Sequence, residues 1–383
     1  MNYLPFTEVF NDESGGNIKT QKGDYLEVGQ IPIVDQGEDL IGGFTDEENK
    51  LCKSDLPIII FGDHTRRFKF VDFPFGMGAD GVKVLKPKIE ADEKYLYYYL
   101  KALHLTDAGY DRHFKYLKRT EILIPPLPEQ KRIAEVLDKA DALREKRRLA
   151  LQKLDTLLQS VFLEMFGDPV KNPMSWDVVT IRDLVSSVKY GTSQKAGSEG
   201  KYPILRMNNI DYQGGWNFSS LKYIEVPDKD LHKYIIRKGD IAFNRTNSKE
   251  LVGKTAVFRE DKEMILAGYL IRVRTDDENN PEYISAFLNS HYGKLVLNNM
   301  CKNIIGMANI NAQELQDISI PKPPKKLQDQ FAKIVEKVES NRKTLNKNIE
   351  ITENLFQSLQ QKAFKGELFE KEGREEIEEA SAG

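Results

Sequence analysis

The chain contains two short stretches that are similar to phosphate-binding patterns, and neither is complete. Residues 76–81, GMGADG, fit G-x-G-x-x-G, which binds a pyrophosphate only where a helix follows it. The next residues, VKVLKP, alternate like a strand and end in proline, so we predict a glycine-rich turn here. Residues 248–255, SKELVGKT, lack the first glycine of a phosphate loop, and TAVF reads as a strand. We therefore expect no bound nucleotide cofactor.

Residues that often serve catalysis or metal binding are scattered along the chain. Close pairs and metal-ligand spacing are lacking among the histidines and cysteines, which are His64, His104, His113, His232, His291, Cys52 and Cys301. The chain also lacks the Asn/Asp-Pro-Pro-Tyr/Phe loop of amino-methyltransferases. We expect no catalytic residue, no metal and no cofactor. The pattern alone leaves open a nuclease built on scattered carboxylates.

Side chains suited to reading DNA gather in predicted loops. Arg and Lys match guanine edges, Asn and Gln match adenine edges, and cations and small donors contact phosphates. In the first part of the chain the candidates are Asp35, Gln36, His64, Thr65, Arg66, Arg67 and Lys69. In the second part they are Tyr190, Thr192, Ser193, Gln194, Lys195, Arg206, Asn208, Asn209, Asn244, Arg245, Thr246, Asn247 and Ser248.

Each single candidate has an alternative interpretation as a solvated loop side chain or a local cap, so the clusters are stronger candidates than their members. The basic and aromatic stretch RHFKYLKR, residues 112–119, also has two interpretations. It either contacts phosphates or covers the domain beside the helix that follows.

Length and composition are those of a globular protein with two or three domains. Hydrophobic residues make up 40% of the 383 residues, and no apolar run reaches the roughly 18–20 residues of a membrane span. The N-terminal residues MNYLPFTEVFNDE lack the basic start and apolar core of a signal peptide, so we expect a cytoplasmic protein without a membrane partner. The net charge of -3 does not by itself indicate nucleic acid. The acidic tail at 371–383 is expected to be disordered.

A repeat at an offset of 198 residues organises the whole chain. Each copy opens with two prolines and continues without a gap into a long polar and apolar pattern. The matched residues include Pro125 with Pro323, Gln130 with Gln328, Arg144 with Arg342, and Phe166 with Phe364. Two unrelated bundle helices are the alternative, which the ungapped match disfavours.

The repeated segment has the pattern of a long helix. Residues 129–166 contain neither Pro nor Gly, and their apolar residues recur at helical, near-heptad spacing. A helix of about 38 residues is roughly 57 Å long, and a single apolar stripe on it requires a partner helix. The second copy supplies that partner. Polar residues, among them Arg147, Asn341 and Asn348, interrupt the apolar seam and can fix its register.

The two intervals between the helices have similar landmarks in the same order. QIPIVDQ corresponds to KYPILRM, KYLYYYLKAL to EYISAFLNS, and EILIPP to DISIPKPP. We therefore predict an α+β fold with two globular domains separated by two long antiparallel helices that form an intramolecular coiled coil. The predicted segments are domain 1 at 1–124, helix 1 at 125–168, domain 2 at 169–320, helix 2 at 321–370, and the tail at 371–383.

The stretch LIPPLPEQKRIAEVLDKADALREKRRLALQKLDTLLQSVFLEMFGD resembles the central repeat of the specificity subunits of type I restriction–modification systems. IVDQG at 33–37 and FGDHTRRFKFVDFPFGMGADGVKVL at 61–85 also resemble a target-recognition domain of that family. The resemblance covers nearly the whole chain. The central repeat is specific, whereas the recognition domains of the family are variable.

The resemblance implies that each globular domain reads one half of a bipartite target in double-stranded DNA. It also implies that the helices set the spacing between the halves and dock two methyltransferase subunits, which bind S-adenosylmethionine and methylate adenine. Restriction subunits are possible further partners. This chain would then be non-catalytic. A non-DNA adaptor with two domains on a coiled-coil spacer and an enzyme acting on nucleic acid are the rival interpretations.

Overall fold

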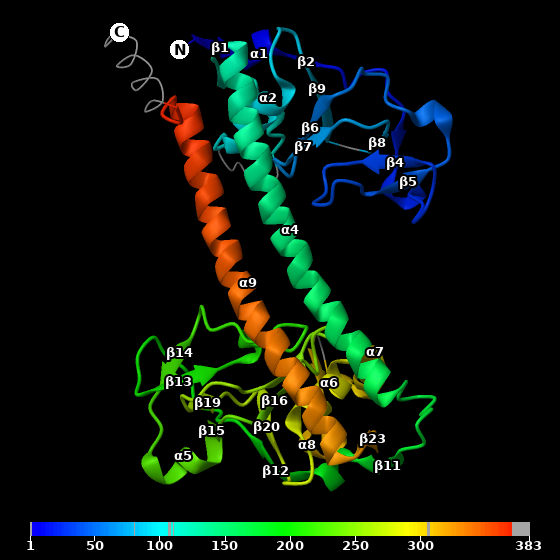
Figure 1. The fold of residues 1–383 in the computed structure, drawn as a ribbon, viewed down its shortest axis with the longest axis vertical. Coiled ribbons are helices and arrows are strands. Elements are labelled where there is room, and N and C mark those ends of the chain that lie inside the picture. Colours follow the sequence, from blue (N-terminus) through cyan, green and yellow to red (C-terminus); the bar gives the residue numbers. More distant parts are fainter. Residues whose placement is uncertain (1, 80, 106–108, 110, 305–306, 370–383) are drawn as a thin grey trace, which may run out of the picture. The chain divides into compact units, whose positions relative to one another are not determined.

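The computed structural model describes residues 2–79, 81–105, 109, 111–304 and 307–369. The chain divides into two compact units. Unit 1 comprises residues 1–147 and 348–383, and unit 2 comprises residues 148–347. Figure 1 shows the helices and strands of each unit, coloured along the sequence. The predicted acidic tail at 371–383 lies outside the described residues.

Two small sheets form the strand-rich part of unit 1. The first has the order β2 (Phe10–Asp12), β9 (Val82–Pro87), β6 (Ile58–Gly62) and β7 (Phe68–Val71), and its pairs are antiparallel. The second has the order β3 (Lys19–Thr20), β8 (Gly76–Gly78), β4 (Ile31–Val34) and β5 (Gly43–Thr45). All of β6 is buried because its run IIIF is apolar on both faces.

The glycine pattern at 76–81 begins as a buried strand. β8 runs parallel to β3 and to β4. A Cβ added at Gly78 would lie 2.5 Å from the Cβ of Asp35, so a larger residue does not fit there. The predicted glycine-rich turn is therefore wrong for residues 76–78, whereas the strand predicted after the pattern is confirmed as β9.

Short helices and one strand pair complete the globular part of unit 1. The helices are α1 (Phe6–Val9), α2 (Glu93–Ala102) and α3 (Phe114–Leu117), with 3-10 turns at Lys22–Asp24 and Glu48–Lys50. β1 (Asn2–Pro5) pairs antiparallel with β10 (Glu121–Ile124). The Asp92 carboxylate caps α2 by accepting a hydrogen bond from the Tyr95 backbone N–H at 2.8 Å.

Unit 2 contains two four-stranded sheets. One has the order β12 (Val185–Tyr190), β20 (Leu270–Thr275), β16 (Ile241–Asn244) and β18 (Thr255–Val257), and the other has β14 (Lys222–Ile224), β13 (Tyr202–Leu205), β19 (Met264–Leu266) and β15 (Ile235–Ile236). A smaller sheet joins β17 (Thr246–Asn247) to the hairpin of β22 (Met307–Asn309) and β21 (Lys302–Ile304). β11 (Asp177–Thr180) pairs with β23 (Ser319–Lys322).

The short helices of unit 2 are α5 (Asp228–Tyr234), α6 (Pro281–Asn289), α7 (His291–Met300) and α8 (Ala312–Gln316). Two 3-10 turns cover Ile181–Leu184 and Met207–Asn209. The strand predicted after residues 248–255 is confirmed as β18. Among the described helices, none combines the length and the apolar composition that a membrane span requires.

Two long helices follow the proline pairs, as the sequence predicts. α4 extends over Leu127–Phe166, 40 residues, and α9 extends over Lys325–Lys365, 41 residues. Proline suits the start of a helix because the backbone N–H groups of the first turn have no acceptor within the helix, so the N–H that proline lacks is not missed. Unit 1 contains the first part of α4 and the last part of α9, and unit 2 contains the remaining part of each.

Within each unit the two helix segments run antiparallel and share an ion pair. In unit 1, Nε and Nη2 of Arg144 contact the Glu353 carboxylate at 2.9 and 2.8 Å, and the Arg147 guanidinium donates to the Asn348 carbonyl. In unit 2, Nη1 of Arg342 contacts Asp155 at 2.6 Å. The two pairs are equivalent at the 198-residue offset, so the repeat seen in the sequence recurs as a repeated contact.

A buried glutamine joins each long helix to its short helix in the same way. The Gln130 side-chain N–H donates to the Pro125 carbonyl at 2.8 Å, and its oxygen accepts from the Asp92 backbone N–H at 2.9 Å. In unit 2, Gln328 makes the matching bonds to the Pro323 carbonyl and the Asn280 N–H, both at 2.8 Å. The glutamine thereby fixes the position of α2 or α6 against the start of its long helix.

Candidate nucleic-acid interface

A tight turn between β6 and β7 carries the first predicted cluster. The Arg66 N–H donates to the Gly62 carbonyl at 2.7 Å, and the Gly62 N–H donates to the Arg67 carbonyl at 2.8 Å. Arg66 adopts the left-handed region with a φ of 59°. A Cβ at Gly62 would lie 2.2 Å from Oγ1 of Thr65, so glycine is required where the turn folds back on itself.

The turn is supported by side chains beneath its exposed surface, which belong to Asp35, Gln36 and Lys69. The Gln36 carbonyl accepts from the Thr65 hydroxyl at 2.7 Å, and its side-chain oxygen accepts from the His64 backbone N–H at 3.2 Å. Lys69 is 6% exposed and lies 3.5 Å from the Asp35 carboxylate. Burial lowers the pKa of Lys69, an effect that the Asp35 carboxylate opposes.

Three of the predicted residues in this turn are exposed to solvent. His64, Thr65 and Arg67 are exposed, and Arg66 is half-buried. Arg67 lies 3.3 Å from Glu38 in an ion pair between two exposed groups, which is a weak interaction in water. The first cluster therefore has two layers. Asp35, Gln36 and Lys69 support the turn, and His64, Thr65 and Arg67 form its exposed layer.

In unit 2 the structure brings together predicted residues from two strands. Tyr190 ends β12, and the Arg245 guanidinium lies over its ring at 4.8 Å. Arg245 Nη2 also donates to Oδ1 of Asn309 at 3.3 Å. Thr246 pairs with Asn309, and Asn247 pairs with Ala308, across β17 and β22.

Four other predicted residues of unit 2 stabilise loops. The Arg206 guanidinium donates to the Ser220 carbonyl at 2.6 Å, and the Asn209 side chain donates to the Asn217 carbonyl at 2.8 Å. Thr192 and Asn244 are buried, and the Thr192 hydroxyl accepts from the Gln194 N–H at 3.2 Å. These side chains are oriented toward the backbone of their own unit.

The remaining predicted residues lie at the surface or close to it. Ser193, Gln194, Lys195 and Asn208 are exposed, and Asn247 and Ser248 are half-buried. Loop positions of this kind can contact phosphates or base edges without moving the sheets beneath them.

Two residues outside the predicted set belong to the unit 2 cluster. Asn309 contacts Arg245 through its side chain, and the Tyr269 carbonyl accepts from the Arg245 N–H at 3.0 Å. Tyr269 is 52% exposed. An isolated Asn and an isolated Tyr give no pattern in the sequence, and only the pairing of β17 with β22 brings Asn309 to this place.

The sequence left two roles open for the stretch at 112–119, which were contact with phosphates and covering of the domain. The structure divides its residues between the buried side and the accessible side. His113 and Phe114 are buried, and the Phe114 N–H donates to the Asp63 carboxylate at 2.7 Å. Arg112, Lys115, Lys118 and Arg119 are exposed. The aromatic residues thus support the domain, and the cations remain accessible.

Residues 248–255 do not form a phosphate cradle. Lys254 is 7% exposed, and its ammonium group donates to the carbonyls of Met207, at 2.8 Å, and Ile210. Burial lowers the pKa of Lys254. Within the described part of the chain, no three His, Cys, Asp or Glu side chains gather as metal ligands would.

Comparison with known protein families gives one match that covers most of the chain. The model of the type I restriction modification DNA specificity domain matches residues 3–153 and again residues 173–353. Each match contains one set of sheets and part of one long helix.

Individual relatives are between 26% and 28% identical to this chain over the matched residues. The specificity subunit of the type I restriction enzyme EcoKI of Escherichia coli K12 is 26% identical over 267 residues, which are 64% of this chain and 57% of that protein. A Methanocaldococcus jannaschii relative named for the specificity subunit of the type I restriction enzyme MjaX is 28% identical over 202 residues, 52% of this chain and 47% of its own length. The chain thus spans about half the length of these relatives.

The fold is similar to that of a solved structure. The S subunit of a type I restriction-modification system from M. genitalium superposes with a TM-score of 0.62 at 17% identity. The superposition covers 95% of this chain and 96% of that one.

Proposed function

Because the chain belongs to the type I restriction modification DNA specificity family, we propose that it is the DNA sequence-specificity subunit of a type I restriction–modification complex. The observation that carries the proposal is the double match of the family model, at 3–153 and 173–353. Two recognition domains in one chain suit a target made of two half-sites. Unit 1 reads one half-site and unit 2 reads the other.

The recognition surfaces are the exposed layers of the two predicted clusters. In unit 1 the turn with His64, Thr65 and Arg67 faces the first half-site. In unit 2 the Arg245 group, with Tyr190 and Asn309, faces the second. Guanidinium and amide groups supply the donors and acceptors that base edges require, and exposed lysines such as Lys195 contact phosphates.

The long helices pair as an antiparallel intramolecular coiled coil that sets the spacing between the half-sites. The ion pairs Arg144–Glu353 and Arg342–Asp155, one in each unit, support this arrangement. Two methyltransferase subunits dock on it, bind S-adenosylmethionine and methylate adenine, and restriction subunits join where the system includes them. The chain itself contributes recognition and no catalysis, and it acts on DNA in the cytoplasm.

An exchange of residues 1–124 for the corresponding domain of another family member tests the proposal. Methylated adenines are mapped across the genome of cells that carry the exchanged chain and its methyltransferase. One half-site is expected to change and the other to persist, because the second domain is untouched. Simultaneous change of both half-sites would contradict independent reading, and absence of any methylation that depends on this chain would contradict the function itself.

A further inference from the structure

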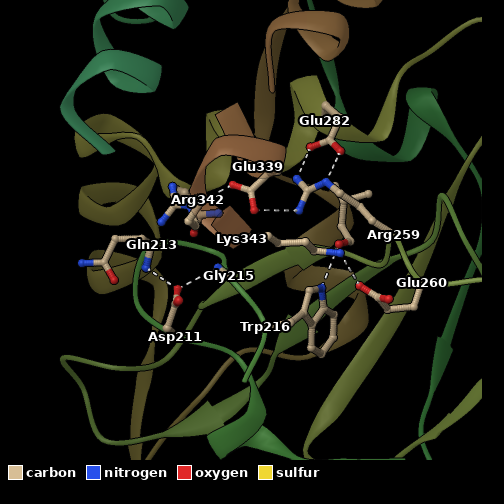
Figure 2. A network of polar contacts seen from close by, with 12 residues as sticks. Asp211, Gln213, Gly215, Trp216, Arg259, Glu260, Glu282, Glu339, Arg342 and Lys343 are labelled. Atoms are coloured by element: carbon tan, nitrogen blue, oxygen red, sulfur yellow. Dashed lines mark hydrogen bonds and ion pairs between the residues drawn. The ribbon is translucent and has the colours of Figure 1, made fainter. Parts of the chain in front are cut away.

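Arg259 lies two residues after β18 and connects the strands of unit 2 to the helices α6 and α9. Its guanidinium makes two hydrogen bonds to the Glu282 carboxylate of α6, at 2.7 and 2.6 Å, and lies 3.9 Å from Glu339 of α9. These three side chains are 25%, 14% and 17% exposed, so water screens their charges only in part. Figure 2 shows Arg259 between the two glutamates. The guanidinium therefore joins one strand, one short helix and one long helix.

Carboxylates outnumber arginines around this contact. Arg342 lies 3.1 Å from Glu339 and 2.6 Å from Asp155. The carboxylates of Asp155, Glu282 and Glu339 thus share two guanidinium groups. Without Arg259, the Glu282 carboxylate would have no cation within ion-pair distance among the described residues, and a mostly buried carboxylate in that state is costly. At this point α6 and α9 depend on a residue that the strands supply.

Unit 1 has an equivalent pair of helices, α2 and α4. Tyr95 of α2 and Tyr283 of α6 are equivalent, since their hydroxyls donate to the carbonyls of Leu123 and Pro321. Leu123 and Pro321 match at the 198-residue offset. The residues of α2 and α6 can therefore be compared one by one.

The residue before this tyrosine has opposite charge in the two units. In unit 1 it is Lys94, which pairs directly with Asp138 of α4. In unit 2 it is Glu282, and Glu336 has the position of Asp138 at the 198-residue offset. Two carboxylates cannot form the pair that lysine and aspartate form, so α6 takes its cation from Arg259. Unit 2 therefore joins strands to helices where unit 1 joins helix to helix.

Arg259 contacts α9 far from the point at which α6 is already held. Gln328 fixes the start of α6 against the start of α9. Glu339 lies eleven residues farther along, which is about 16 Å on a helix. One contact leaves a body free to turn about it, and a second contact at a distance restricts that rotation. The two hydrogen bonds to Glu282 have a fixed geometry, so they restrict the orientation of the strands more than apolar packing alone does.

β18 supports both groups of predicted recognition residues in unit 2. It pairs antiparallel with β16, and Arg245 directly follows β16. The Val257 carbonyl of β18 accepts a hydrogen bond from the Trp216 indole N–H at 2.8 Å, which anchors the loop that begins near Asn208. All residues of β16 and β18 are buried. A change in the orientation of β18 therefore moves the loops of Arg245 and Asn208 together, and we call these two the unit 2 recognition loops.

We propose that Arg259 is a positioning residue for DNA recognition, which fixes the orientation of the unit 2 recognition loops on α6 and α9 and thereby the gap at which the second half-site is read. The proposal rests on the proposed function, which supplies the two half-sites. Base contacts belong to the Arg245 group. A change at Arg259 therefore alters which gaps are accepted, whereas a change at Arg245 alters which bases are accepted.

The first test is Arg259→Gln, which removes the charge. Methylated adenines are mapped across the genome of cells that carry the variant chain and its methyltransferase. Sites whose gap is one base pair longer or shorter than in the wild type are expected to become at least about tenfold more frequent, since no ionic contact then opposes a turn of the strands. The half-site sequences are expected to stay the same. Tm is expected to fall by at least about 4 °C, because one partner of a mostly buried ion pair is lost.

A second substitution separates positioning from stability. In Arg259→Gln combined with Glu282→Lys, the new lysine has the place of Lys94 and can pair with Glu339, so Tm is expected to return to within about 2 °C of the wild type. The strands still lack their buried contact with the helices, and the exposed pair Glu260–Lys343 adds little. The relaxed gap is therefore expected to persist, whereas a merely structural residue would show recovery of both Tm and gap.

Two further variants control for charge and for folding. Arg182→Gln removes an arginine of the same unit that bonds to Gln313 at 2.9 Å and Asp317 at 2.6 Å, outside the long helices, and it is expected to keep the wild-type gap. Arg259→Lys keeps the charge and loses the two-pronged geometry of the guanidinium. It is expected to fold and to relax the gap less than Arg259→Gln does.

The outcomes separate the positioning role from the function beneath it. Wild-type gaps in the double variant, or in Arg259→Lys should the double variant fail to fold, would overturn the proposal. Relaxed half-site sequences with an unchanged gap would overturn it too, because the effect would then be local to the Arg245 group. So would an equal relaxation in Arg182→Gln. Absence of any methylation that depends on the wild-type chain would instead sink the proposed function.

Discussion

At the residue scale, Lys294 shows how burial in unit 2 changes a side chain's chemistry. Its ammonium group lies over the Tyr212 ring at 4.8 Å and donates to the Gly253 carbonyl at 3.3 Å. Burial, with a smaller contribution from Lys254, lowers the pKa of Lys294 from 10.5 to about 8, although Asp211 acts in the opposite direction. Keeping this group charged therefore costs free energy in the folded protein.

The substitution Lys294→Met is expected to stabilise the protein at pH 7 by roughly 1 to 3 kcal/mol, because it removes a poorly solvated charge. Below about pH 8 both the folded and the unfolded wild type hold the proton, so the gain is constant there. Between about 8 and 10.5 the unfolded chain binds more protons than the folded chain, so the wild type becomes relatively more stable and the gain shrinks. Urea unfolding of both proteins at pH 7 and pH 10 measures the difference, and a gain that grew with pH would contradict the argument.

We expect Arg245 to read a base in unit 2. The Tyr190 ring and the Asn309 oxygen orient its guanidinium group. Arg245→Ala is expected to cost about 1 to 3 kcal/mol of DNA-binding free energy. It should also relax specificity in the second half-site only.

Genome-wide mapping of methylated adenines and fluorescence anisotropy on the assembled complex measure both effects. The matched control is Arg237→Ala, since Arg237 is an arginine of the same unit with an ion pair to Glu263 at 2.7 Å. Equal losses in the two variants would mean that charge alone, and not the position of Arg245, accounts for the effect.

Residue types identify the candidate loops but not the role of each member. Asn, Thr and Asp side chains can read a base, and they can equally bond to nearby backbone groups and stabilise turns. The structure uses Asn209 and Thr192 in the second way, and the sequence has no signal that separates the two uses. Asn309 escaped prediction because a strand pairing brings it beside Thr246 from far along the chain.

At the element scale, the long helices were predictable because a helical period sustained over dozens of residues is a strong signal. The boundaries followed from the prolines, and α4 and α9 begin within two residues of Pro126 and Pro324. The strand β8 was not predictable from its three residues, since glycines usually indicate a turn. Its place depends on a close approach to Asp35 and Tyr25, which the local sequence does not encode.

The helix pair is expected to act as a ruler between the two half-sites. Seven residues inserted between Arg147 and Arg148, and seven more between Lys347 and Asn348, lengthen both helices by about 10.5 Å while keeping the heptad seam. Base pairs stack at roughly 3.4 Å, so the gap between the half-sites should grow by about three base pairs while the half-sites themselves stay the same.

These insertion points lie at the boundaries between the units, so each ion pair stays within its own unit. Methylome sequencing reads the gap, after assembly with the methyltransferase has been verified. An insertion into α4 alone is the control and is expected to impair assembly, because the two helices then no longer match in length. An active double insertion with an unchanged gap would show that the helices do not set the spacing.

At the scale of the whole molecule, charge limits what the chain can do alone. The net charge of -3 gives little general attraction to phosphates, which dominate the affinity of most DNA-binding proteins. The lone chain is therefore expected to bind its target weakly, and added methyltransferase should raise the affinity at least about tenfold and steepen its salt dependence. Fluorescence anisotropy at several salt concentrations tests this, with DNA lacking the target as control. Tight, specific binding by the lone chain, unchanged by the methyltransferase, would contradict it.

The sequence predicted an alternation of domain, helix, domain and helix. In the structure, the two compact units each contain parts of both long helices. Each unit takes one part of α4 and one part of α9. Phe356 and Ala363 complete the core of unit 1, and Phe162 and Phe166 complete that of unit 2. The repeat is visible in the sequence, but the exchange of helix segments depends on pairing between distant residues, which a single sequence does not reveal.

This division has a consequence for the order in which the protein is made. Unit 2 is one continuous stretch, 148–347, whereas unit 1 needs residues at both ends of the chain. Ribosomes release the N-terminal residues first, and domains usually fold in that order. Here the ribosome delivers every residue of the second unit before it delivers Phe356, which completes the first. The N-terminal domain must therefore wait through the synthesis of its neighbour, with the apolar face of its helix uncovered, before its own core can close.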